Sequence, residues 1–370
     1  MTPLPLEGIT VVAIEQAVAA PFASGRLADA GARVVKIERP EGDFSRAYDA
    51  AAAGQSSYFV WLNRGKHSVV LDLTSPEGKA RLEDLVSGAD VVLQNLRRGA
   101  LSRLGFDPAR LRRDYPGLII CSITGYGQEG PMADRKAYDL LIQAETGLTS
   151  VTGGPDGPSR VGISVVDIAT GATAHAAILE ALIRRGKTGQ GAEISVSMFD
   201  VMAEWMTVPL LNHEARNTPQ RMGLAHPSIA PYGVFTTRDG GQILLAIQSD
   251  REWVSLVEQV VHSPELAQDP RFSTNVARVA NRQDTDAHVA QALVALDRSE
   301  AIAALDAATI AFALVNDMDG LGAHPHLRRM NVDTPNGPVS LPAPAPIFSG
   351  ETRAFGPVPA LGSAGADAHD

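Results

Sequence analysis

The stretch ITVVAIEQAVAAPFASGRLADAGARVVKIER, residues 9–39, decides the fold of this chain. It joins a run of β-branched residues, ITVVAIE, to a helical pattern, PFASGRLADAG, and then to a second such run, ARVVKIER. Strands that alternate with helices in this way form βαβ units, whose two strands lie parallel in one sheet. The N-terminal part of the chain is therefore predicted to be an α/β domain built on a parallel sheet.

The same alternation continues through the first 200 residues. Thr74 or Ser75 is expected to cap the helix that begins at Pro76 and ends near Gly88. Another helix is expected around GALSRLG, and another in AYDLLIQAETGLTSVTG. Four further segments are predicted to be strands: SVVLDL, DVVLQN, PGLIICSITG and AEISVS. The large domain is accordingly predicted to cover residues 1–211.

The pattern changes after about residue 212. Residues 212–232 are rich in Pro, His and Asn and show no period, which indicates a linker or a binding loop. Residues 233–324 are predicted to form a small α+β domain, because a hairpin pattern, GVFTTRDGGQILLAI, is followed by helical patterns. Residues 325–370 are rich in Pro and are expected to be extended.

Length and charge limit the class of protein. The chain has 370 residues, 45% of them hydrophobic, which is enough for two globular domains. The net charge of −10 argues against a general nucleic-acid binder. The first 150 residues, however, carry 17 Lys or Arg against 18 Asp or Glu, so a local patch for a small polyanion is possible there. Its candidate cations are Arg33, Lys36, Arg39, Arg64, Lys66, Arg97, Arg98 and Arg103.

Several other classes are not expected. The N-terminus lacks a signal-peptide pattern, and no apolar run of about 20 residues is evident, so we expect a cytoplasmic protein without a membrane partner. The single cysteine, Cys121, excludes an intrachain disulfide, and the nine histidines show no spacing typical of metal ligands. GYGQEG, residues 125–130, fits a dinucleotide-binding fingerprint, but Pro131 follows it instead of a helix.

RVGISVVDIATGATAHAAILEALIRR, residues 160–185, places Asp167 where a run of β-formers gives way to an Ala-rich helical pattern. Two interpretations remain open from the residues alone. Asp167 can be the N-cap of the helix, accepting a backbone N–H. Alternatively it is a nucleophile, because ligands of open α/β sheets bind at the carboxyl ends of strands.

Six separated segments carry a further signal through their order and spacing: LADAGARVVKIERPEGD, NRGKHSVVLDLTSPEGKARLEDLVSGADVVLQNLRRGALSRLGFD, KAYDLLIQAETGLTSVTG, VGISVVDIATG, RRGKTGQGAEISVSMFD and PHLRRMN. In this order and spacing they resemble the class III coenzyme A transferases (CaiB/BaiF-like), a family that also contains the α-methylacyl-CoA racemases. The resemblance implies a Rossmann-like large domain completed by residues 325–370, a small domain joined by two linkers, and a homodimer of interlocked rings.

The resemblance also implies an activity. Asp167 falls on the family's catalytic aspartate, which forms an anhydride with the acyl group and then a thioester with CoA. CoA is thus part of the substrate, and the partners expected are an acyl-CoA and a carboxylic acid acceptor, with no tightly bound cofactor or metal. Positions that resemble the family's CoA contacts are Arg39, Asn95, Leu96, Leu104, Lys136 and Tyr138. Gln16 lies near the usual glutamine contact, and whether it replaces that glutamine stays open.

Three functions are weighed within the resemblance. A racemase needs two acid–base groups, and that branch has a histidine where this chain has Tyr138, so CoA transfer is favoured. A non-catalytic CoA-binding protein is the third alternative. EQAVAAPFAS and AYDLLIQAETGLTSVTG look most like the branch that handles C4 and C5 dicarboxylates (succinyl, mesaconyl, citramalyl or itaconyl type). Tyr138 and, in the 212–232 loop, Arg221, His226 and Tyr232 are the candidates for contacting the acyl group.

Overall fold

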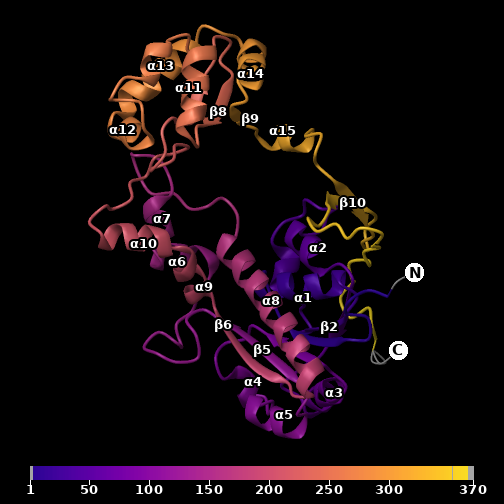
Figure 1. Cartoon of the computed structure of the whole chain (residues 1–370). Coiled ribbons are helices and arrows are strands. Elements are labelled where there is room, and N and C mark those ends of the chain that lie inside the picture. The colour runs from indigo at the N-terminus through magenta and orange to yellow at the C-terminus, as the bar shows by residue number, and fades with distance from the viewer. Residues whose placement is uncertain (1–2, 352, 366–370) are drawn as a thin grey trace. The chain divides into compact units, whose positions relative to one another are not determined.

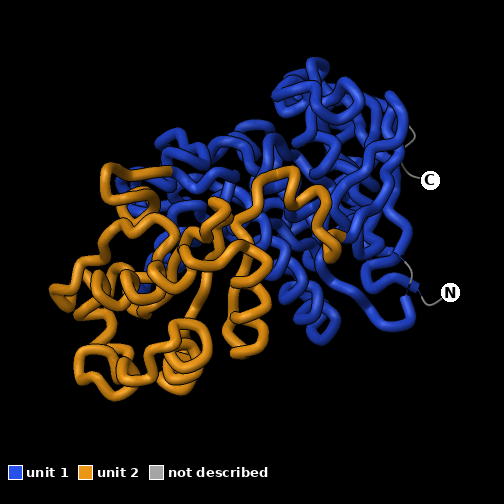
Figure 2. The backbone as a smooth tube through the Cα atoms, turned by 90° about the horizontal axis from the view of Figure 1, so that it is seen from above, with its two compact units in different colours: residues 1–148, 160–208, 328–370 blue, residues 149–159, 209–327 orange. Residues whose placement is uncertain are grey.

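The computed structural model describes residues 3–351 and 353–365, and Figure 1 shows its elements along the chain. The contacts divide the chain into two compact units, which Figure 2 colours separately. Unit 1 contains residues 1–148, 160–208 and 328–370, and unit 2 contains residues 149–159 and 209–327. The N-terminal and C-terminal parts of the described chain therefore belong to the same unit.

Unit 1 is built on a parallel sheet of six strands, as the sequence predicted. Its strands lie in the order β3-β2-β1-β4-β5-β6, so the direction of winding reverses between β1 and β4. This strand order is that of Rossmann folds, which bind ligands at the reversal. The strands are β1 (Thr10–Ile14), β2 (Arg33–Glu38), β3 (Lys66–Val70), β4 (Val91–Gln94), β5 (Ile119–Thr124) and β6 (Ala192–Ser197).

Helices cover both faces of this sheet. The helices assigned to unit 1 are α1 (Ala19–Asp29), η1 (Phe44–Ala47), α2 (Ser57–Asn63), α3 (Pro76–Ser87), α4 (Ala100–Arg103), α5 (Pro108–Asp114), α6 (Asp139–Glu145), α7 (Leu148–Val151), α8 (Val165–Thr188) and α9 (Met198–Trp205), with α7 running across the boundary between the units. Ser75 caps α3 by accepting the Gly78 N–H, which confirms one of the two caps that the sequence offered.

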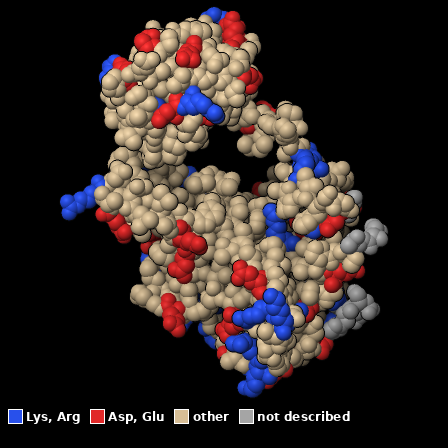
Figure 3. Space-filling view, in the orientation of Figure 1, with Lys and Arg blue, Asp and Glu red and all other residues tan. Residues whose placement is uncertain are grey.

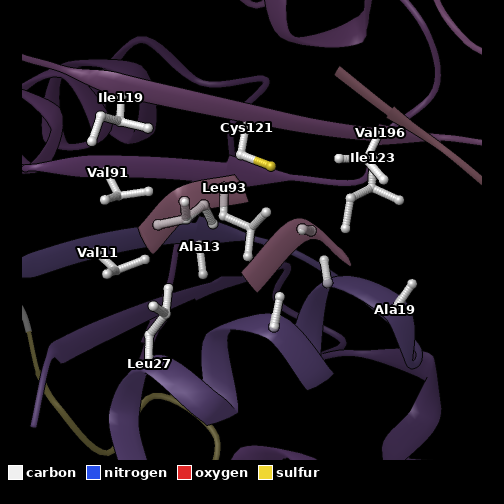
Figure 4. Packing of buried hydrophobic residues seen from close by; sticks show 14 of the residues in the cluster. Val11, Ala13, Ala19, Leu27, Val91, Leu93, Ile119, Cys121, Ile123 and Val196 are labelled. Atoms are coloured by element: carbon white, nitrogen blue, oxygen red, sulfur yellow. The ribbon is translucent and has the colours of Figure 1, made fainter. Parts of the chain in front are cut away.

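Alternate residues of the central strands enter two separate cores, because successive side chains of a strand point to opposite faces. Val11 and Ala13 of β1 pack with α1 and α8, and Figure 4 shows this core around Cys121. Val12 and Ile14 pack instead against α3, α4 and α5. Both faces of the sheet are thus buried, which leaves the ends of the strands as the accessible edge.

The start of α8 lies close to the start of α1. A Cβ atom at Gly171 of α8 would collide with the Ala19 carbonyl oxygen of α1, so only glycine permits this approach. Thr170, next to it, is fully buried. The close contact brings the first turns of two helices to the same edge of the sheet.

The C-terminal segment returns to unit 1. It contains a two-stranded antiparallel sheet of β10 (Arg329–Val332) and β11 (Val339–Pro342). Val332 and Val358 of this segment are buried against Phe59 and Val60 of α2. A small apolar core therefore anchors the last part of the chain beside α2.

Unit 2 has its own apolar core, centred on Trp253 and Phe272. The predicted hairpin is present, since β7 (Tyr232–Thr236) pairs antiparallel with β8 (Gln242–Ala246), and β9 (Ala311–Leu314) adds a third strand. The helices assigned here are α10 (Thr207–Glu214, which begins in unit 1), α11 (Asp250–Gln259), η2 (Pro264–Ala267), α12 (Asn275–Ala280), α13 (Arg282–Leu293), α14 (Arg298–Ala307) and α15 (Met318–Gly322).

Two sequence expectations need correction. Residues 160–164 form no strand, so Asp167 does not follow one, and it lies in the first turn of α8. The second concerns α8: no apolar run of about 20 residues was expected, yet this helix is long and apolar enough to span a membrane by length and composition. Part of its apolar surface, including Val166, Ala174 and Ile178, packs in the core with α1, β5 and β6, and the rest is exposed.

Candidate functional site

A cavity of about 900 Å³ opens in unit 1 at the carboxyl ends of the central strands. Residues 16–19 after β1, 95–98 after β4 and 123–125 at the end of β5 line it, together with residues 133–139. The cavity therefore lies at the point where the winding of the sheet reverses, which is where ligands bind in open α/β sheets. Asp167 also lines it.

Asp167 is the third residue of α8, and its side chain does not cap the helix. Ser164 holds the N-cap position but makes no side-chain cap bond. The start of α8 is capped instead from another helix, because Asp139 Oδ1 accepts the N–H groups of Val166 (2.8 Å) and Asp167 (3.2 Å). The N-cap interpretation of Asp167 is thus wrong, and its carboxylate has no hydrogen-bond partner within residues 3–351 and 353–365.

Burial raises the pKa of Asp167 to about 7, and the negative charge of Asp139 adds to the rise. Both effects disfavour the ionised form, because the carboxylate gains no compensating hydrogen bond or cation. A carboxylate with such a pKa is more basic than an ordinary aspartate and is still about half ionised at neutral pH. Strongly shifted acids in a cavity are typical of functional sites.

An aromatic wall faces the same cavity, and sequence reasoning missed most of it. Phe44, Tyr48 and Tyr58 line the cavity with Tyr138, and the Tyr48 ring lies 5.7 Å from Phe44 and 5.6 Å from Tyr58. The Tyr58 hydroxyl is 3.4 Å from Ser164 Oγ. Partial burial, with Asp43 and Asp167 nearby, raises the pKa of Tyr48 to about 12, so its hydroxyl keeps its proton.

Two of the predicted CoA contacts line this cavity after β4. The side-chain amide of Asn95 makes two hydrogen bonds to the backbone of Gln16 in the β1–α1 loop. Its Nδ2 donates to the Gln16 carbonyl (2.8 Å), and its Oδ1 accepts the Gln16 N–H (3.0 Å). Leu96 contributes to the cavity wall beside it. Asn95 therefore holds the loop in place, and Gln16 lies in the cavity lining.

Two other predicted CoA contacts lie outside this lining. Arg39, which is exposed, lines a smaller cavity of about 80 Å³ at the ends of β1 and β2, and Leu96 borders that cavity too. Leu104 is partly buried and packs against the core beneath α4. Of Arg39, Leu96 and Leu104, only Leu96 lines both the large and the small cavity.

Cations gather at the rim of the large cavity. Lys136 and Tyr138, both predicted as contacts, are exposed there, and Tyr138 is 64% exposed. Arg98 pairs with Asp134 at 3.1 Å. Arg97, Arg103 and Arg135 also line the cavity. On the face drawn in Figure 3, basic and acidic side chains are interspersed over unit 1.

Three of the cations proposed for a surface patch are buried. Lys36 and Lys66 have no exposed side-chain surface, and they contact Glu15 at 3.4 Å and 2.7 Å. Arg64 is buried against Asp29. These three residues therefore belong to the interior, which corrects the sequence-based assignment of a surface patch.

The predicted acyl contacts of the 212–232 loop have partners within unit 2. Arg221 donates to the carbonyl oxygens of Gly154 (3.1 Å) and Ser150 (3.3 Å). The ring of His226 stacks on Tyr232, with the ring centroids 5.3 Å apart. Arg221 thus ties residues 149–159 to the rest of unit 2. Among the described residues, no group of three or more His, Cys, Asp or Glu forms a metal-binding cluster.

Comparisons with known proteins show which family this chain resembles over nearly its whole length. The family model CoA-transferase family III matches residues 6–364. The chain is 36% identical to the succinate–glutarate CoA-transferase of Agrobacterium fabrum, over 97% of this chain and 93% of that protein. It is 39% identical to the acetyl-CoA:oxalate CoA-transferase of Acetobacter aceti, over 78% and 75%. The crystal structure of a CAIB/BAIF family protein from Brucella suis is similar, with a TM-score of 0.84, 35% identity, and coverage of 99% and 98%.

Proposed function

This chain belongs to CoA-transferase family III, and we propose that it moves CoA from an acyl-CoA thioester to a carboxylic acid through covalent bonds to Asp167. One observation supports this role most directly: Asp167 lines the large cavity of unit 1 without a hydrogen bond or counter-ion among the described residues. A carboxylate that is tied up in a cap or a salt bridge is a poor nucleophile, whereas this one is available.

The transfer proceeds in four bond exchanges. The Asp167 carboxylate attacks the thioester carbonyl, the C–S bond breaks, and an anhydride and the CoA thiolate form. The thiolate attacks the aspartyl carbonyl carbon and releases the donor acid, which carries away one oxygen of Asp167. The acceptor carboxylate then attacks this aspartyl-CoA thioester, and the released thiolate takes the acyl group from the second anhydride. One thioester replaces another, so the exchange needs no ATP.

Each attack builds negative charge on a carbonyl oxygen, which backbone N–H groups can stabilise. The first N–H groups of α8 are already bonded to Asp139. The start of α1 has no side-chain cap, and residues 16–19 line the cavity. We therefore assign the oxyanion contact to the amides at the start of α1.

The basic rim suits the phosphate groups of CoA. Lys136, Arg97 and Arg103 supply cations at the mouth of the cavity, and cations bind phosphate through strong charge-assisted hydrogen bonds. Arg39 adds a cation at the neighbouring smaller cavity. With the phosphates at this rim, the thioester end of the substrate would reach towards Asp167.

We assign the acids to the dicarboxylate class. The relatives from Agrobacterium fabrum and Acetobacter aceti bear names that specify succinate, glutarate and oxalate. The hydroxyls of Tyr48, Tyr58 and Ser164 offer neutral donors to a second carboxylate. Arg221 and His226 stay candidates for the same role. If Arg221→Ala lowered transfer to a monocarboxylate and a dicarboxylate equally, that role would be refuted.

The expected homodimer has support in α8. The exposed residues Ala172, Ala176 and Ile183 follow one another along one side of this helix. A small, apolar stripe of this kind lets another helix approach closely. Light scattering should give the mass of two chains, and Ile183→Glu should weaken the association. A mass of one chain for the wild type would contradict the dimer.

Mass spectrometry of the intact protein tests the covalent step. The wild type is incubated with succinyl-CoA or mesaconyl-CoA, with and without hydroxylamine, and a CoA or hydroxamate adduct is expected on Asp167. Asp167→Ala should form no adduct. Asp200→Ala is the matched control, because Asp200 lies at the same position in the first turn of α9 and should leave the adduct intact. Exchange of the α-proton without an adduct would instead indicate a racemase.

A further inference from the structure

Two walls of the large cavity meet at a single buried carboxylate. The first wall is the β1–α1 loop, residues 16–19, and the second is η1 with its flanks, which carries Phe44 and Tyr48. Asp43 lies between them. Its Oδ1 accepts the N–H of Ala17 in the first wall at 3.2 Å and the N–H of Ser45 in the second at 2.9 Å. Asp43 therefore joins the two walls directly.

Asp43 forms an ion pair with a buried cation. Lys36 Nζ donates to Asp43 Oδ2 at 2.9 Å, and neither side chain is exposed. Lys36 also lies 3.4 Å from Glu15, which receives a second lysine, Lys66, at 2.7 Å. Two carboxylates and two ammonium groups thus balance in charge. Burial alone would raise the pKa of Asp43, but Lys36 and the backbone N–H groups hold it below its usual range.

The loop that Asp43 holds has an unfavourable backbone conformation. Ala17 has a φ of 63°, in the left-handed region that residues with a side chain rarely adopt. Such a conformation persists only where surrounding contacts fix it. Asn95 fixes the carbonyl and N–H of Gln16, and Asp43 fixes the N–H of Ala17. The conformation of the loop therefore depends on these two side chains.

We propose that Asp43, with its buried counter-ion Lys36, is a positioning residue for the transfer reaction. Asp43 is absent from the lining of the large cavity and borders the smaller one, and it sets the β1–α1 loop and the η1 wall at fixed places around the large cavity. Preorganised walls accelerate a reaction because small displacements of the reacting groups cost large factors in rate. The proposal rests on the proposed transferase function, since it concerns the rate of adduct formation at Asp167.

The test separates the rate of adduct formation from the amount of active enzyme. The full chain is mixed with excess succinyl-CoA in a rapid-quench instrument, and intact mass gives the rate and the final extent of adduct. Asp43→Asn keeps an acceptor for the two N–H groups but loses the charge that faces Lys36, and we expect a rate about 10-fold lower. Asp43→Ala loses both, and we expect about 100-fold. The final extent should stay near that of the wild type.

Asp107→Ala is the matched control, because Asp107 also caps a helix in unit 1 but does not line the cavity. Its adduct rate should equal that of the wild type. An Asp43 variant with an unchanged rate of adduct formation but a reduced final extent would show that Asp43 acts only on folding. A variant with both the rate and the extent unchanged would show that Asp43 has no role in the reaction. Either result overturns the proposal. If Asp43→Ala does not fold, Asp43→Asn and Lys36→Met carry the same test.

Failure of the proposed function has a different signature. In that case the wild type itself would form no adduct on Asp167, and the positioning role would fall with it. When the wild type reacts, only the variants decide the role of Asp43.

Discussion

Unit 1 contains two regions whose carboxylates are withdrawn from water, almost fully for Glu15 and Asp43 and partly for Asp167, and their chemistry is opposite. Glu15 and Asp43 accept hydrogen bonds from buried lysines, whereas Asp167 has no partner among the described residues. Burial by itself would raise the pKa of all three. The lysines reverse this effect and lower the pKa of Glu15 and Asp43, while the pKa of Asp167 rises to about 7.

The difference teaches that the partner of a buried carboxylate, and not its burial, indicates its role. Paired carboxylates keep their charge and fix geometry, and removal of one member of a buried ion pair typically costs about 3–5 kcal/mol. An unpaired carboxylate is costly to keep ionised, so its presence in a cavity calls for a functional explanation.

The largest effect is expected at the unpaired carboxylate. Asp167→Ala should lower transfer by about 10⁴-fold or more, because the covalent route disappears. The protein should remain folded, since Asp167 makes no hydrogen bond through its side chain. Steady-state transfer assays and circular dichroism check both statements. Substantial residual transfer by a pure sample of this variant would show that another group attacks the thioester.

A change in the paired region should act on stability. Lys66→Met removes the closest cation of Glu15 and leaves that buried carboxylate with the more distant Lys36 and the Ser24 hydroxyl. We expect a loss of about 3–5 kcal/mol in the free energy of unfolding, measured with urea. Lys187→Met, at the exposed end of α8, is the control and should change it little. A Lys66 variant as stable as the wild type would mean that the buried pair contributes nothing.

The negative charge of Asp139 affects the pKa of Asp167. Because its charge raises the pKa of Asp167, Asp139→Asn should lower that pKa while an amide oxygen still caps α8. The nucleophile must be ionised, so the wild-type rate of adduct formation should fall as the pH drops through about 7. In the variant the midpoint should move down by about half a unit to one unit. A midpoint unchanged or moved upwards would contradict this coupling.

The smallest effect is expected at the basic rim. Arg97→Ala should raise KM for the acyl-CoA by about fivefold to tenfold and change kcat less, because one charge-assisted contact with phosphate is lost. The loss should shrink at high salt, which screens exposed charges. Arg112→Ala, an exposed cation of α5 outside the cavity, provides the comparison. Equal effects of the two variants would place the phosphates elsewhere.

Local patterns predicted the scaffold well. The parallel sheet follows from alternating runs of β-formers and helix-formers, and the hairpin of β7 and β8 follows from its turn residues. The cap of α3 by Ser75 was predictable, because Pro76 and the apolar spacing after it already mark the start of a helix. In each case residues close in sequence determine the structure.

Contacts between distant residues were not predictable in this way. The cap of α8 comes from Asp139, 28 residues before Asp167, so the local pattern pointed to the wrong aspartate. Lys36 and Lys66 looked like surface charges, because nothing local shows that Glu15 lies between them. Tyr48 follows η1, and Tyr58 lies at the start of α2. The sequence between β2 and α2 has no clear pattern, and only its position after the carboxyl end of a parallel strand indicated a site.

Isotope transfer reports the covalent role of Asp167 through the oxygen atoms of its carboxylate. With an acceptor acid labelled with ¹⁸O in its carboxylate, each turnover leaves one acceptor oxygen on the aspartate, because the second anhydride is cleaved at the acceptor carbon. Digestion and mass spectrometry after turnover should therefore find ¹⁸O in the peptide that contains Asp167. Transfer of CoA to the labelled acid without ¹⁸O in that peptide would contradict the account.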